Sequence, residues 1–81
     1  MKYRTKFILP GAHGGCVKLF DCEAGSPAEA AAIADSHWRQ NWVGELPPRA
    51  VIHVHEYLAD GRINDQVAFN LMWTDSDYFL K

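Results

Sequence analysis

The sequence lacks any long apolar run. No stretch approaches the roughly 20 apolar residues that a membrane-spanning helix needs. The opening segment, MKYRTKFILPGAHGG, has too short an apolar core for a secretory signal peptide. We therefore expect a cytoplasmic protein with no membrane partner.

Cysteine is scarce as well, with only Cys16 and Cys22 in the chain. If the run CVKLFDC is extended, their α-carbons lie ~20 Å apart at ~3.3 Å per residue, whereas a disulfide tolerates at most ~7 Å. Two reduced thiols in a reducing compartment are expected. No familiar zinc spacing appears, so we expect neither a metal site nor a cofactor.

The chain also carries little net charge, formally -2 with a pI near 6.0. Such a balance argues against a protein that simply coats nucleic acid or anionic membrane. Its 81 residues, 48% of them hydrophobic, suffice for a single domain over 1–81 with one modest core. So small a domain has little room for a deep cleft, which favours surface binding over enzymatic catalysis.

The clearest local motif in the sequence predicts where a helix begins. In SPAE, Ser26 suits the N-cap, Pro27 the first helical position, and Glu29 the other half of a capping box. The helix is predicted to reach about Trp42 and to end by Gly44, because LPP follows. One stripe should face the core: Pro27, Ala30, Ala31, Ala34, Trp38 and Trp42.

Two strand-like runs precede this helix. KYRTKFIL alternates with a period of two, PGAHGG interrupts it, and CVKLFDC resumes the alternation. A hairpin that pairs Leu9 with Val17 and Phe7 with Leu19 would gather both apolar sets on one face. The opposite face would then hold Arg4, Lys6, Lys18 and Phe20.

Two more strand-like runs flank Asp60-Gly61, a dipeptide typical of a type I′ hairpin turn. A two-residue loop would place four pairs on one face: Leu58–Ile63, Val54–Val67, Ile52–Phe69 and Ala50–Leu71. Ile52 and Val54 should then point toward the helix, and His53 and His55 away from it. The tail TDSDYFLK fits either a capped turn or an extended end.

These elements predict an α+β fold, a four-stranded antiparallel sheet in ββαββ order with one α-helix packed on one face. The other sheet face remains open for a partner protein or a second copy, so a homodimer is one expectation.

Two polar clusters are candidate partner-binding sites. His53 and His55 lie on one face ~7 Å apart but lack a third ligand, so they fit a contact surface or solvated imidazoles better than a metal site. Glu56 and Asp65 fall opposite each other, near Asp60. They either lie in water or form an acidic spot for a partner's Arg or Lys.

An alternative function rests on basic and aromatic residues of the open face. Interleaved residues of these types hold single-stranded nucleic acid by stacking and by contacts to phosphate. Against this, RNP-like segments are absent and the net charge is negative. The nucleic-acid-binding candidates are Arg4, Lys6, Lys18, Phe20 and Tyr57.

The order of hairpin, helix and hairpin, with the alanine-rich helix in GSPAEAAAIADSHW, resembles small phage and mobile-element proteins, among them anti-CRISPR proteins. The likeness lies in size and architecture over the whole chain. It implies a stoichiometric inhibitor in the host bacterial cytoplasm that occupies a CRISPR effector complex and blocks target DNA binding. Partner-binding residues would be Glu56, Asp60 and Asp65, with His53, His55 and Tyr57 beside them.

Overall fold

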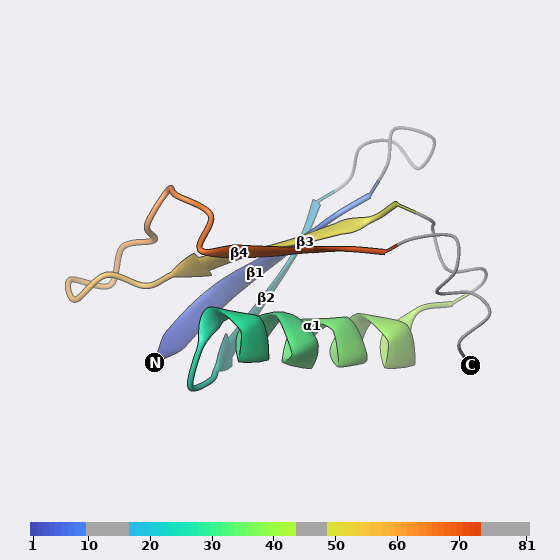
Figure 1. Ribbon diagram of the computed structural model, residues 1–81, viewed down its shortest axis with the longest axis horizontal. Coiled ribbons are helices and arrows are strands. Elements are labelled where there is room, and N and C mark those ends of the chain that lie inside the picture. The colour runs from blue at the N-terminus through green and yellow to red at the C-terminus, as the bar shows by residue number, and fades with distance from the viewer. Residues whose placement is uncertain (10–16, 44–48, 74–81) are drawn as a thin grey trace.

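The computed structural model describes residues 1–9, 17–43 and 49–73. Within these residues the elements are β1 (Lys2–Ile8), β2 (Val17–Glu23), α1 (Pro27–Asn41), β3 (Val51–Glu56) and β4 (Phe69–Met72). The strands form one antiparallel sheet in the order β2-β1-β3-β4. Helix α1 covers one face of this sheet (Figure 1). The predicted α+β class and ββαββ order are confirmed.

Helix α1 begins where the local sequence places it. The Ser26 hydroxyl accepts a hydrogen bond from the Glu29 amide at 3.1 Å, and Pro27 occupies the first turn. The helix ends at Asn41, and Trp42 is already extended with φ -82 and ψ 135. This end agrees with the prediction, while Gly44 lies outside the described residues.

The buried face of α1 combines small side chains with two large rings. Ala30, Ala31 and Ala34 are fully buried, which lets the helix backbone approach the sheet. Trp38 and Trp42 pack against the core from the following turns. The predicted core stripe is therefore confirmed from Ala30 onward, while Pro27 is half-buried.

The core is centred on Phe7 in β1. Its ring stacks on Trp38 at a centroid distance of 5.2 Å and meets the edge of Trp42 at 5.7 Å. Trp73, directly after β4, lies 4.8 Å from Phe7 and is 1% exposed. The indole N–H of Trp73 donates to the Asp35 carboxylate of α1, which ties the end of β4 to the helix.

The predicted pairing of β1 with β2 is wrong by one residue. Ile8 lies opposite Val17, and Phe7 lies opposite Lys18 rather than Leu19. Because side chains alternate along a strand, this shift moves every β2 side chain to the other face. Val17 and Leu19 consequently point away from α1 and are 49% and 53% exposed.

Phe20 takes the place beneath the helix that the sequence pattern gave to Leu19. Its ring stacks on His37 of α1 at a centroid distance of 4.0 Å, and its carbonyl accepts from the Thr5 hydroxyl at 2.6 Å. The same register sets Arg4 opposite Asp21. Burial of an aromatic ring and an opposite-charge pair together favour this register over the predicted one.

The predicted pairing of β3 with β4 is wrong by two residues. Ile52 lies opposite Leu71 and Val54 opposite Phe69. An even shift preserves the faces, so Ile52 and Val54 are fully buried beneath α1 while His53 and His55 point to the other side. The expected sorting of apolar and imidazole side chains is confirmed.

The turn at Asp60-Gly61 shifts the pairing by one residue in the opposite direction. The Leu58 amide donates to the Arg62 carbonyl at 2.7 Å, so three residues rather than two form the loop, and the Leu58–Ile63 pair is wrong. Gly61 has φ 88, as a three-residue loop with a bulge requires. Beyond Ile63, which bridges to Tyr57, residues 64–68 leave the ladder and supply the extra residues that bring Phe69 opposite Val54.

Two predictions concern residues outside the described ranges. The first is the predicted distance between Cys16 and Cys22, because Cys16 lies in the gap at 10–16. The second is the conformation of the tail TDSDYFLK. Cys22 itself is a free thiol, and partial burial raises its pKa, so it is protonated at neutral pH.

Candidate functional site

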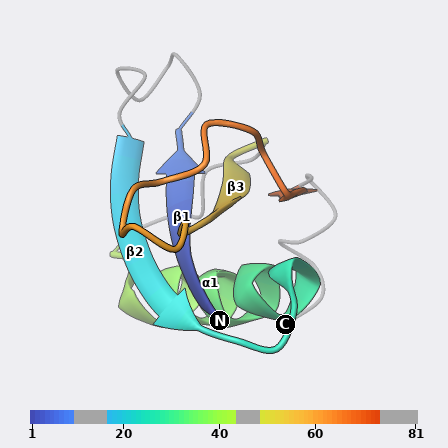
Figure 2. The ribbon, with the colours of Figure 1, turned by 90° about the vertical axis from the view of Figure 1, so that its left-hand side faces the viewer.

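The sheet face away from α1, termed the open face, is partly roofed by the connection between β3 and β4. This connection, residues 58–68, is termed the arm, and Figure 2 shows it passing in front of β1 and β2. Between sheet and arm lies a groove of about 580 Å³. It is lined by Arg4, Lys6, Ile8, Val17, Leu19, His53, His55, Ile63, Asp65 and Val67.

Half of the groove lining is aliphatic. Ile8, Val17 and Leu19 come from the two strands at one side of the sheet, and Ile63 and Val67 come from the arm. Val67 is 42% exposed, comparable with Val17 and Leu19. The groove therefore presents aliphatic side chains to solvent from both the sheet and the arm.

Lys6 and His53 contribute polar side chains to the groove. They are cross-strand neighbours on β1 and β3. Burial lowers the pKa of His53, and the nearby His55 and Lys6 lower it further, so the imidazole is neutral at pH 7. Within the described residues Lys6 forms no ion pair, so its ammonium group is available to a ligand.

His55 holds the arm rather than facing solvent. It is only 4% exposed, and its Nδ1 lies 2.9 Å from the carbonyl oxygen of Asn64. A carbonyl only accepts hydrogen bonds, so Nδ1 carries the proton and donates. The ring of His53 is 6.5 Å away. Of the two histidines predicted as a contact surface, only His53 is placed to reach a partner through the groove.

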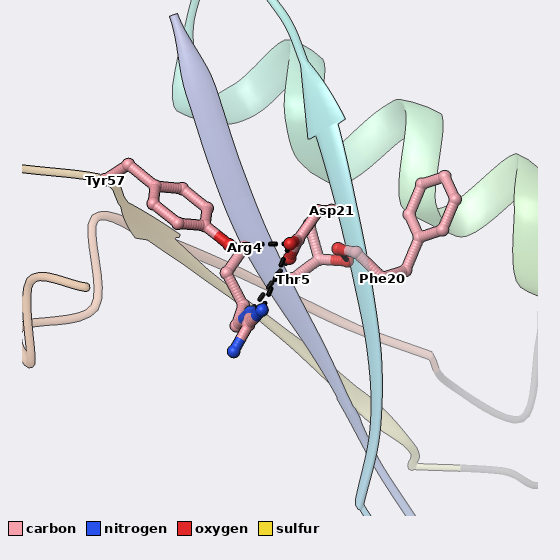
Figure 3. A network of polar contacts seen from close by, with 5 residues as sticks. All are labelled: Arg4, Thr5, Phe20, Asp21 and Tyr57. Atoms are coloured by element: carbon pink, nitrogen blue, oxygen red, sulfur yellow. Dashed lines mark hydrogen bonds and ion pairs between the residues drawn. The ribbon is translucent and has the colours of Figure 1, made fainter. Parts of the chain in front are cut away.

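The open face also carries a polar network that joins Arg4 of β1, Asp21 of β2 and Tyr57, the residue after β3 (Figure 3). Arg4 donates to both carboxylate oxygens of Asp21 at 2.8 and 3.1 Å, and the Tyr57 hydroxyl donates to the same group at 2.6 Å. The hydrogen bonds from Arg4, and then that from Tyr57, lower the pKa of Asp21. Asp21 in turn raises the pKa of Tyr57. The network leaves the Arg4 charge neutralised.

The predicted acidic spot is not assembled. Glu56 pairs with Tyr3 and so belongs to the helix-facing set, whereas Asp65 lines the groove. The expectation that these two carboxylates oppose each other is wrong, because the arm leaves the ladder just before Asp65. Asp60 is bound by Arg62 within its own turn at 2.6 Å, and hydrogen bonds from Arg62 lower its pKa.

The predicted nucleic-acid-binding set is divided between the two faces. Arg4, Lys6 and Tyr57 lie on the open face. Phe20 lies beneath α1, and Lys18 lines a separate hollow of about 290 Å³ with Trp38, Asn41, Trp42 and Val43. The one-residue register shift of β2 is the cause. Lys2 lies over the Tyr57 ring at 4.7 Å and covers part of its stacking surface.

The aliphatic groove residues are the part of the site that sequence reasoning missed. Val17 and Leu19 read as core residues, because alternation alone does not say which face the helix covers. The signal that could have found them is Asp21: pairing its charge with Arg4 forces Val17 and Leu19 onto the open face.

Neither a metal centre nor a membrane span is found in the described part of the chain. Among residues 1–9, 17–43 and 49–73, no three His, Cys, Asp or Glu side chains are close enough to hold a metal ion. The one helix described there is too short to cross a bilayer.

Comparison of the chain with protein-family models, curated proteins and solved structures found no match.

Proposed function

We propose that this protein is a non-enzymatic protein-binding module whose contact surface is the groove. The observation that carries the proposal is the set of exposed aliphatic side chains on the open face, Val17, Leu19 and Val67. A protein interface usually combines an apolar centre with a polar rim. Here the aliphatic side chains share the groove with the polar groups Lys6, His53 and Asp65.

The charge of the groove also suits a protein better than a phosphate backbone. Asp21 neutralises Arg4, Lys6 and Asp65 carry opposite charges, and His53 is neutral at pH 7. Binding to a nucleic-acid backbone depends on several cations without partners that displace counterions. A protein surface that offers an aliphatic group beside a carboxylate would fill the aliphatic walls and meet the ammonium of Lys6.

In its narrower form the proposal is a stoichiometric inhibitor of a CRISPR effector complex in the bacterial cytoplasm. The support is the resemblance in size and in hairpin, helix, hairpin order. An inhibitor of this kind needs only a surface that competes with target DNA, and it needs no catalytic group.

The proposal can be tested directly by titrating the purified protein against purified CRISPR effector complexes. Binding would be followed by biolayer interferometry and capture of target DNA by gel shift. We expect saturable binding and loss of DNA capture. Val67→Arg, which places a charge in the groove, should weaken binding at least roughly tenfold if Val67 lies within the contact. Ser36→Arg introduces the same side chain on the exposed face of α1 and should bind like wild type.

Three results would count against the proposal. Absence of binding to every effector complex would remove the inhibitor role. Equal binding by Val67→Arg and Ser36→Arg would remove the groove as the contact. Salt-sensitive binding to single-stranded oligonucleotides that is lost in Lys6→Ala would instead identify the open face as a nucleic-acid-binding surface.

A further inference from the structure

The outer edge of β2 carries backbone groups that have no partner among the described residues. Met1 and Ala24 exchange both backbone hydrogen bonds, at 3.1 and 3.0 Å. Such pairs alternate along an antiparallel ladder, so the even-numbered residues of β2 bond to β1. The N–H and C=O groups of the odd-numbered residues point outward. None of them has a hydrogen bond among the described residues: Val17, Leu19, Asp21 and Glu23.

Among the described residues, this edge is long and regular. Natural sheets protect their edge strands by keeping them short, by bulges or proline, by charged side chains, or by covering them. Strand β2 contains no proline and pairs with β1 over seven consecutive positions without a bulge. The other edge strand, β4, has only four residues. Strand β2 does carry Lys18, Asp21 and Glu23, of which Asp21 is already paired with Arg4. Its length and regular pairing still leave a complete row of backbone groups for one more strand.

We propose that this edge pairs antiparallel with β2 of a second copy of the chain, which joins two four-stranded sheets into one of eight strands. The register is centred on Phe20, because only this register uses all seven residues. It pairs Val17 with Glu23, Lys18 with Cys22, Leu19 with Asp21, and Phe20 with its own counterpart.

Charge and hydrogen bonding both agree with this register. No two like charges lie directly opposite, whereas moving the centre to Asp21 would set two aspartates against each other. In this register the outward N–H and C=O groups belong to the Val17–Glu23 and Leu19–Asp21 pairs. These pairs therefore form the new hydrogen bonds between the two copies. The Phe20 pair is then of the close, non-hydrogen-bonded type. This match of the strand to itself favours a second copy over a foreign peptide.

The side chains extend the same layers across the joint. The two Phe20 rings meet beneath the helices, each already stacked on its own His37. On the opposite side, Leu19 of each copy lies opposite Asp21 of the other and Val17 lies opposite Glu23, so the two aliphatic pairs lie toward opposite ends of the joint. The dimer thus presents two grooves on one face of a single sheet. The proposed dimer does not depend on which partner binds the groove.

A new thiol tests the register. In a Cys16→Ser background, Lys18→Cys places its sulfur opposite Cys22 of the second copy, where a close cross-strand pair matches disulfide geometry. Mild oxidation should give a dimer on a non-reducing gel, and mass spectrometry should identify the peptide joining position 18 to Cys22. Ser36→Cys in the same background, exposed on α1, should give no preferred link. Random links from both variants would overturn the register.

Sedimentation equilibrium tests the dimer itself. At roughly 200 µM, a concentration suited to a small interface, wild type should show the mass of two chains. Leu19→Pro removes one outward N–H without removing a bond to β1, so it should show the mass of one chain with unchanged circular dichroism. Wild type at one-chain mass at this concentration, with no link to Cys22, would overturn the dimer. Neither outcome depends on effector binding.

Discussion

At the residue scale, Asp21 is the acceptor that connects three strands. Arg4 from β1 and Tyr57 beyond β3 both donate to it. Because these bonds favour the ionised carboxylate, the stabilisation is present above the ordinary pKa of aspartate. It is lost as the pH falls through the lower pKa of the folded protein.

The pKa of Asp21 is directly measurable by NMR titration of its carboxyl carbon. We expect a value below the ordinary 3.8. Arg4→Gln removes the largest cause and should return the value toward 3.8. Arg62→Gln, which removes a guanidinium that serves Asp60 instead, should leave Asp21 unchanged. A wild-type value at or above 3.8 would show that the network does not form in solution.

His53 provides the second prediction at this scale. Its pKa in the fold is lower than the ordinary 6.5, so the unfolded chain takes up a proton first as the pH falls. The free energy of unfolding should therefore decrease below pH 6.5, and level off once the pH passes the folded pKa. Urea denaturation at several pH values should show a shallower decrease for His53→Asn. Equal slopes would mean that His53 is fully hydrated.

At the scale of single elements, α1 depends on its N-cap. Ser26→Ala removes the acceptor for the Glu29 amide and should lower the free energy of unfolding by about 1 kcal/mol. The matched control is Ser36→Ala on the exposed face of the same helix, which should change stability by less than about 0.5 kcal/mol. Thermal or urea denaturation would compare the two. Equal losses would contradict the capping role.

The arm depends on the turn at Gly61. Gly61→Ala forces a side chain into the left-handed region at φ 88 and should cost about 1 kcal/mol. Gly25→Ala is the matched control, because its new methyl group meets only the flexible end of Glu29 at 3.4 Å. That variant should stay within about 0.5 kcal/mol of wild type. A Gly61→Ala protein as stable as wild type would mean that the loop adopts another geometry.

The contrast between α1 and β2 shows what local sequence patterns determine. The cap at Ser26-Pro27 acts over four residues, so the start of the helix could be predicted. The facing of Ile52 against His53 follows from alternation once the helix is placed. The register of β2 depends instead on contacts distant in sequence, Arg4 with Asp21 and Phe20 with His37. The arm likewise departs from the ladder where His55 binds the Asn64 carbonyl.

At the scale of the whole molecule, the sheet separates two kinds of chemistry. One face packs aromatic rings around Phe7 beneath α1, with Trp73 fixed by Asp35. The other face carries the groove and the polar network beside it. The core thus lies on one side of the sheet, and the groove lies on the other.

The β2 register decides this separation, because a slip of one residue would bury Leu19 and expose Phe20. Proton NOE spectroscopy of the folded protein tests it most directly. The stacked rings of Phe20 and His37, 4.0 Å apart between centroids, should give strong ring-to-ring cross-peaks. The methyl groups of Leu19 should give none to the rings of His37 or Trp38. Cross-peaks from Leu19 to those rings, with none from Phe20, would contradict the account and remove the groove.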